Sequence, residues 1–114
     1  MYDAYDVREL PELLRRLARK DKLAFKKHAL LRMYQREVLV EEVKEALLNS
    51  EVIESYTSDK PLPSFLVLGY TLKRRPLHVV FALDLEGEMI WIITVYQPSD
   101  EEWEEGFRKR RGKI

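Results

Sequence analysis

The sequence predicts an α+β domain, with N-terminal helices packed on one face of a four-stranded antiparallel sheet and a C-terminal helix after it. Three observations support this. Apolar residues recur at helical spacing up to about residue 50, and four later segments are rich in β-branched and aromatic residues. The connections between those segments are short, which favours antiparallel pairing. Helices that precede such a sheet in sequence are expected to cover one of its faces.

The first half of the chain accounts for three helices. Leu10, Leu13, Leu14 and Leu17 share one helical face, which predicts a helix over 11–20, and a short extended segment, LAF, follows at 23–25. The next helix is predicted over 28–36, with apolar residues on one arc and polar residues on the other. A third helical segment, EEVKEALLNS, has its acidic residues in the first turn, where the helix dipole favours them.

Four strands are expected at VIESYT, SFLVLGYTL, LHVVFALDL and MIWIITVYQ, separated by SDKPLP, KRRP and EG. In the last hairpin we favour a three-residue loop with Gly87 in the left-handed conformation. This loop places His78 opposite Thr94, with Tyr96 nearby. A two-residue turn would instead place Val95 opposite His78.

A final helix is expected to begin at Ser99. Glu102 lies three residues later and completes a capping box, while acidic residues fill the first turn and basic residues the last. Trp103 and Phe107 are spaced to dock this helix on the body of the domain.

Composition narrows the classes of function. The 114 residues suit one domain, with zero formal net charge and no cysteine, which excludes disulfides, zinc–thiolate sites and a cysteine nucleophile. Two histidines without acidic neighbours at ligand spacing predict no metal or other cofactor. We expect a cytoplasmic protein, because no secretory signal or membrane span is evident. The charges are segregated: residues 22–36 contain no acid, and an acidic run at 100–105 precedes a basic run at 108–113.

HALLRMYQR followed by EEVKEAL resembles the signature of domain-of-unknown-function family 4258, and RPLHVVFAL and the TVY element resemble later parts of it. The resemblance covers about 25–111, so residues 23–111 would be the family-like core and 1–22 an N-terminal helical extension of a single domain. It implies kinship with the RelE, BrnT and barnase-like assemblage, in which helices pack against a curved antiparallel sheet. Many such relatives are metal-independent endoribonucleases and toxins. The resemblance therefore implies RNA as substrate and a cognate antitoxin, of zinc-finger type in some members, as partner.

Metal-free RNA cleavage needs a base for the 2′-hydroxyl, an acid for the leaving 5′-oxygen and cations for the phosphorane, and it leaves a 2′,3′-cyclic phosphate. Histidine suits proton transfer and arginine suits phosphate. The candidate catalytic residues are His28, Arg32, Arg36, His78, Thr94 and Tyr96. The candidate RNA-binding residues are Lys73, Arg74, Arg75, Arg108, Arg110 and Arg111.

Each candidate has a plainer explanation. The bases on the 28–36 helix could be an ordinary solvated face. His78 could be a half-buried histidine bonded to a threonine hydroxyl. The basic residues at 73–75 could serve solubility, and those at 108–111 could interact with the helix dipole. The rival function is a non-catalytic RNA- or protein-binding module with the same fold. Convergence of the helix and strand residues on one surface would favour the enzyme.

Overall fold

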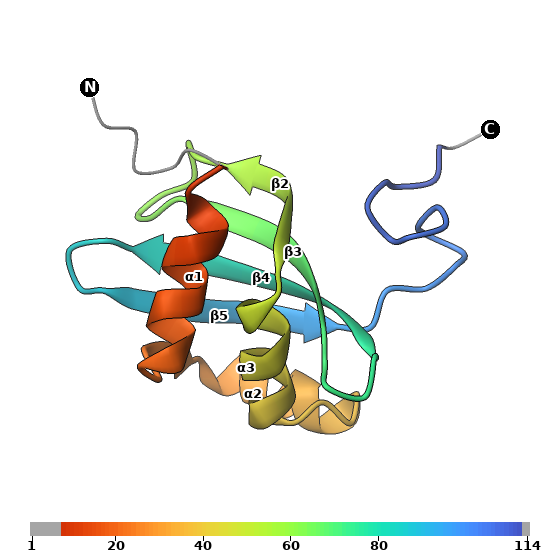
Figure 1. The fold of residues 1–114 in the computed structure, drawn as a ribbon, viewed down its shortest axis with the longest axis horizontal. Coiled ribbons are helices and arrows are strands. Elements are labelled where there is room, and N and C mark those ends of the chain that lie inside the picture. The colour runs from red at the N-terminus through yellow and green to blue at the C-terminus, as the bar shows by residue number, and fades with distance from the viewer. Residues whose placement is uncertain (1–7, 113–114) are drawn as a thin grey trace.

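The computed structural model describes residues 8–112 and shows an α+β fold of three helices and a five-stranded mixed sheet within them (Figure 1). The elements run in the order α1 (Leu10–Arg19), β1 (Leu23–Phe25), α2 (Lys27–Gln35), α3 (Val40–Leu48), β2 (Glu51–Tyr56), β3 (Ser64–Tyr70), β4 (Pro76–Asp84) and β5 (Met89–Tyr96). The three predicted helices and four predicted strands all exist, with small differences at their ends.

The sheet corrects the predicted architecture. Its order is β1-β5-β4-β3-β2, and β1 pairs with β5 in parallel, with Leu23 opposite Ile90 and Phe25 opposite Ile92. The expected four-stranded, wholly antiparallel sheet is therefore wrong. Three residues are too few to show a strand period, so the sequence predicts LAF as an extended segment without a partner strand. The parallel pairing is sterically allowed because two helices and three strands separate β1 from β5.

The helices cover one face of the sheet, as Figure 1 shows for α1 and α3. The core on this face is closed to solvent; its members include Leu14, Met33, Val43, Phe65, Val79, Phe81 and Ile92. The side chains that alternate with these strand residues point to the opposite side, which we call the second face. From the register, the second face includes Leu66, Leu68, His78, Val80, Ala82, Trp91, Thr94 and Tyr96.

The chain reverses between α2 and α3. Glu37 adopts a left-handed conformation (φ 56°), which ends α2. The backbone N–H of Leu39 donates to the Glu42 carboxylate at 2.9 Å, so α3 begins with half of a capping box although Leu39 has no polar side chain. The two helices are therefore separate.

The last hairpin differs from the favoured register. Asp84 lies opposite Met89, which is the register of the alternative two-residue turn, and Val80 lies opposite Thr94 after a bulge. The bulge shifts the pairing by one more residue, so His78 lies opposite Tyr96, not Thr94 or Val95. The loop is held by the Asp84 carboxylate, which accepts from the Gly87 N–H at 2.9 Å.

No helix follows β5 within the described residues. The turn at Ser99 forms, since the Trp103 N–H donates to the Ser99 carbonyl at 3.1 Å, but Gly106 and Phe107 take positive φ values of 91° and 60°. Trp103 instead pairs with Arg110 as an antiparallel bridge. The predicted C-terminal helix is wrong because one capped turn does not overcome the cost of helix nucleation when the tryptophan is buried on the second face.

Candidate functional site

The polar side of α2 forms a row of bases along the β5 edge. Ala29 and Met33 face the core, while His28, Arg32 and Arg36 are exposed at four-residue intervals. We call these three residues the basic row. Arg36 donates to the Thr94 hydroxyl at 3.1 Å and to a β5 carbonyl at 2.9 Å. Since residues four apart lie on one side of a helix, the whole basic row flanks the same edge of the second face.

Within residues 8–112, the side chains of His28 and Arg32 form neither hydrogen bonds nor ion pairs. Arg36 is only partly committed, because its guanidinium has more donors than the two bonds use. The guanidinium groups of Arg32 and Arg36 are thus available to an anion.

His78 lies beneath the surface with both ring nitrogens engaged. Its Nε2 lies 2.8 Å from the Phe107 carbonyl oxygen and its Nδ1 lies 3.2 Å from the Tyr96 hydroxyl. A carbonyl only accepts, so Nε2 carries the proton and Nδ1 accepts from the phenol. The edge of the His78 ring meets Trp103, with centroids 4.3 Å apart. The buried imidazole therefore orients Tyr96, whose side chain is half-buried on the second face.

His78 should make stability fall as pH falls. Burial lowers the pKa of His78 in the folded protein. Below pH 6.5 the unfolded chain therefore binds a proton at this histidine more readily than the folded chain does. We expect the free energy of unfolding to be level above that pH and to decline below it, by at most about 1.4 kcal/mol per pH unit. Urea titrations between pH 8 and pH 5 measure this slope.

The comparison variants are His78→Gln and the exposed His28→Gln. His78→Gln should reduce the slope of the free energy of unfolding against pH by the contribution of one proton, and His28→Gln should leave the slope unchanged. An identical decline in all three proteins would show that His78 titrates alike in both states.

A second polar group adjoins Tyr96. Arg110 donates to both carboxylate oxygens of Glu54, at 2.8 and 3.0 Å, and its guanidinium lies 4.6 Å from the centre of the Trp103 ring. The Tyr56 hydroxyl also donates to Glu54. Arg110 lowers the pKa of Glu54, while the bond to Glu54 raises the pKa of Tyr56. We call Glu54, Tyr56, Tyr96 and Arg110 the phenol cluster.

Burial raises the pKa of Tyr96, so this phenol stays protonated near neutral pH. Tyr96 and Arg110 are among the residues predicted from the sequence, and Glu54 is not. The only signal for Glu54 is an acid alternating with Tyr56 on one side of a strand, a pattern common in half-exposed strands.

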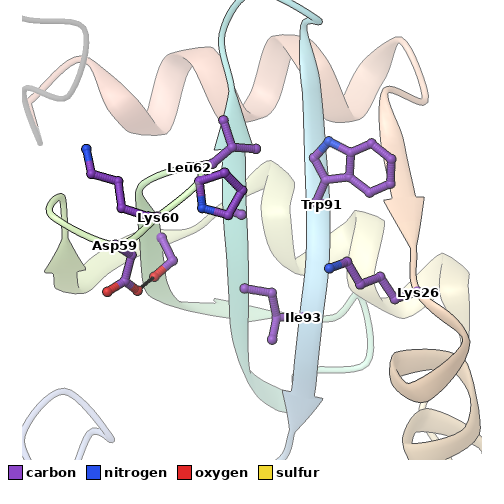
Figure 2. A pocket seen from close by; sticks show the side chains of 9 residues that line it. Lys26, Asp59, Lys60, Leu62, Trp91 and Ile93 are labelled. Atoms are coloured by element: carbon purple, nitrogen blue, oxygen red, sulfur yellow. Dashed lines mark hydrogen bonds between the residues drawn. The ribbon is translucent and has the colours of Figure 1, made fainter.

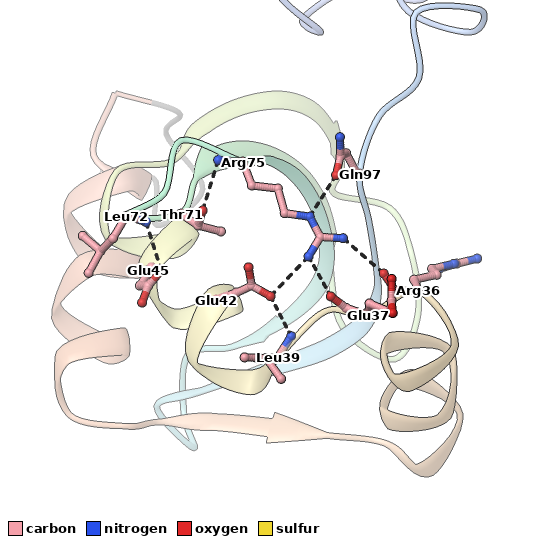
Figure 3. Close-up of polar contacts among 9 residues, drawn as sticks. All are labelled: Arg36, Glu37, Leu39, Glu42, Glu45, Thr71, Leu72, Arg75 and Gln97. Atoms are coloured by element: carbon pink, nitrogen blue, oxygen red, sulfur yellow. Dashed lines mark hydrogen bonds and ion pairs between the residues drawn. The ribbon is translucent and has the colours of Figure 1, made fainter.

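Arg75 was a candidate for RNA, but the structure uses it to join elements. Its guanidinium donates to the Gln97 side chain (2.8 Å), the carbonyls of Glu37 (2.7 Å) and Arg36 (3.1 Å), and the Glu42 carboxylate (3.2 Å), as Figure 3 shows. Arg75 thus closes the α2–α3 junction against the end of β5.

The other predicted RNA-binding residues divide into two groups. Lys73 and Arg74 are exposed in the β3–β4 turn. Arg108 is paired with Glu51 at 2.9 Å, Arg110 with Glu54, and Arg111 donates to the Asp100 carbonyl. The C-terminal arginines therefore bind the body of the domain, and Arg110 alone among them joins the phenol cluster.

Two pockets lie on the surface of the described residues. A pocket of about 370 Å³ lies on the second face beside Trp91, and another of about 550 Å³ lies between α2 and α3 beside Tyr34. Among the described residues, no three histidine, aspartate or glutamate side chains are grouped to hold a metal ion. None of the helices in residues 8–112 is long and apolar enough to cross a membrane.

These features define an α+β domain in which arginines of α2 lie along the edge of a mixed sheet. Residues 25–97 match the family described as "Domain of unknown function (DUF4258)", and because this is more than half of the chain, the protein belongs to that family. The matched span begins in β1 and ends just after β5, so it contains the basic row, His78 and Tyr96. No curated protein and no solved structure matches the chain.

Proposed function

We propose that this protein is a metal-independent endoribonuclease that acts on cytoplasmic RNA, of the RelE/BrnT-like kind, and is the toxin of a toxin–antitoxin pair. The observation that carries the proposal is the contact of Arg36 with Thr94, which joins the basic row to the strand that carries Tyr96 two residues later. An RNA strand lying along β5 would meet phosphate-binding cations and a protonated phenol on the same edge.

The structure changes the roles expected for the two histidines. His78 is buried and serves as a positioning residue for Tyr96, because neither of its nitrogens is available to a substrate. His28 lies eight residues, or about 12 Å, from Arg36 along α2, so it would contact a neighbouring nucleotide and not the phosphate held at Tyr96.

In the proposed reaction, Tyr96 is the general acid that protonates the leaving 5′-oxygen. Glu54 is the general base for the 2′-hydroxyl, once substrate draws Arg110 toward the phosphate. Arg36 and Arg110 then stabilise the phosphorane charge. Attack of the 2′-oxygen on phosphorus expels the 5′-oxygen and leaves a 2′,3′-cyclic phosphate, with no metal required.

The second candidate is a non-catalytic RNA-binding module. It is favoured by the saturation of the phenol cluster, in which Glu54 and Arg110 satisfy one another and His78 satisfies Tyr96. This candidate uses the same basic row, so it differs from the first only in lacking the chemical step.

The experiment incubates the purified protein with single-stranded RNA in EDTA and measures binding and 2′,3′-cyclic phosphate. We expect Tyr96→Phe to lower the cleavage rate by about 100-fold or more at unchanged affinity. Arg32→Ala with Arg36→Ala should weaken binding about 10-fold or more and reduce the salt slope by about 1.4, the value for two phosphate contacts.

The matched control is Arg16→Ala with Arg19→Ala, which removes two exposed arginines from α1, on the helix-covered side. It should bind and cleave as the wild type does. Binding without cleavage by the wild type would favour the module, and absence of RNA binding would overturn both candidates.

The proposal includes an antitoxin as protein partner. Its support is a set of exposed apolar side chains around the hollow between α2 and α3, unusual for the surface of a lone domain. The set comprises Leu30 (44% exposed), Tyr34 (83%), Leu39 (65%) and Val40 (43%).

A further inference from the structure

The 370 Å³ pocket on the second face lies between β5 and the loop that joins β2 to β3. Figure 2 shows Trp91 on one side and Leu62, Asp59 and Lys60 on the other, with Ile93 between them. Its volume falls within the usual range for small-molecule sites.

The pocket has apolar walls suited to a flat ring. Trp91 is only half-buried and Ile93 is 42% exposed, although both belong to the last strand of the domain. Pro61, Leu62 and Ala82 complete the apolar lining. An exposed indole beside aliphatic side chains is the arrangement on which nucleobases stack, since every base has a π-face.

The rim of the pocket carries charges of both signs. Lys26 comes from the β1–α2 junction and Lys60 from the loop, and neither forms an ion pair within residues 8–112. Asp59 accepts from the Ser64 hydroxyl through Oδ2, which fixes the carboxylate and leaves Oδ1 and the second lone pair of Oδ2 open to N–H donors. The lysines would hold phosphates, and the carboxylate would hold the edge of a base.

A fixed carboxylate selects among bases. Guanine offers the N1–H and N2–H donors side by side, and a carboxylate accepts both. Adenine and uracil lack such an adjacent pair, so guanine should bind best.

The pocket also lies along the strand that carries the proposed acid. Trp91 and Tyr96 are five residues apart on β5, or about 16 Å, so a base in the pocket and a phosphate at Tyr96 could belong to one short stretch of RNA. Lys26 immediately precedes α2 and thereby continues the basic row toward the pocket.

We infer that this pocket is a subsite for one unpaired base of RNA, preferably guanine, stacked on Trp91 and read by Asp59. The inference rests on the proposed function for its substrate class and adds a base preference at a position distinct from the cleaved bond. A free guanosine 5′-monophosphate offers the same chemistry and serves as the independent probe.

The test measures the affinity of the full chain for guanosine 5′-monophosphate and for single-stranded hexamers that carry one guanine or one adenine. We expect Trp91→Ala to weaken binding of the guanine hexamer about 5- to 100-fold and Trp91→Phe to restore most of it. Asp59→Asn should abolish the preference for guanine and leave adenine binding unchanged. Leu72→Ala, which truncates an exposed apolar side chain in the β3–β4 turn, is the matched control and should have no effect.

The outcomes separate the two claims. If hexamer binding depended on Arg32 and Arg36 but not on Trp91 or Asp59, the subsite would be overturned and the proposed function would stand. Guanosine monophosphate bound through Trp91, without any RNA binding, would support the pocket as a nucleotide site and overturn the proposed function. No binding of either probe would overturn both.

Discussion

Replacement of Gly69 by alanine is expected to lower the free energy of unfolding by about 3 kcal/mol or more. Gly69 lies in β3 beneath α3, and a Cβ added there would lie 2.1 Å from the Ala46 carbonyl oxygen and 2.9 Å from its Cα. The obstacle is helix backbone, which cannot rotate away as a side chain can. The helix would have to lift off the sheet and open the core around Val43 and Leu47.

Chemical denaturation of Gly69→Ala measures the loss. Gly112→Ala is the matched control, because a Cβ there meets nothing within 4 Å, and its stability should equal that of the wild type. A loss below about 1 kcal/mol in Gly69→Ala would mean that α3 does not approach β3 as closely as described.

Replacement of Arg75 by alanine is expected to cost about 2 to 3 kcal/mol, the second-largest effect on stability. The change leaves two backbone carbonyls at the end of α2 without this donor, and the Glu42 carboxylate keeps only the Leu39 N–H. A hydrogen bond to a charged group contributes roughly 1.5 to 3 kcal/mol. Because Arg75 is partly exposed, its hydrogen bonds together should contribute no more than the upper value for one such bond.

Thermal and urea unfolding of Arg75→Ala check this value. Arg75→Lys should recover less than half of it, because an ammonium cannot span partners that the planar guanidinium reaches together. Lys73→Ala, in the same turn but exposed, should change stability by no more than about 0.5 kcal/mol. If Lys73→Ala and Arg75→Ala lowered stability equally, Arg75 would be a surface cation, as its prediction as an RNA-binding residue assumes.

Periodicity predicted the elements whose packing is local. Leu14 and Leu17 on one face of α1, and the alternation along β4, follow from burial on a single side, which a sequence displays directly. The partner of a strand, by contrast, is determined by segments far away in the chain. LAF is a strand only because β5 offers it an edge, and the turn at Ser99 fails to extend because Trp103 finds a buried site on the second face.

The candidate site was predictable to the same degree. Helical spacing alone predicts that Arg32 and Arg36 share a side of α2. The partner of His78 depended on the register of the hairpin turn and on a bulge in β5, which together shifted the pairing by two residues and replaced Thr94 by Tyr96. Glu54 reaches the phenol cluster through Arg110, a contact across 56 residues that no local pattern contains.

The parallel ladder between β1 and β5 has a consequence for synthesis of the chain. Leu23 to Phe25 leave the ribosome long before their partners at Ile90 to Ile92, so the arginines of α2 have no sheet edge to flank while the intervening residues are being made. Closing so long a loop is slow relative to local helix formation. The surface that combines α2 with β5, on which the proposed function depends, should therefore form only when nearly the whole chain has been translated.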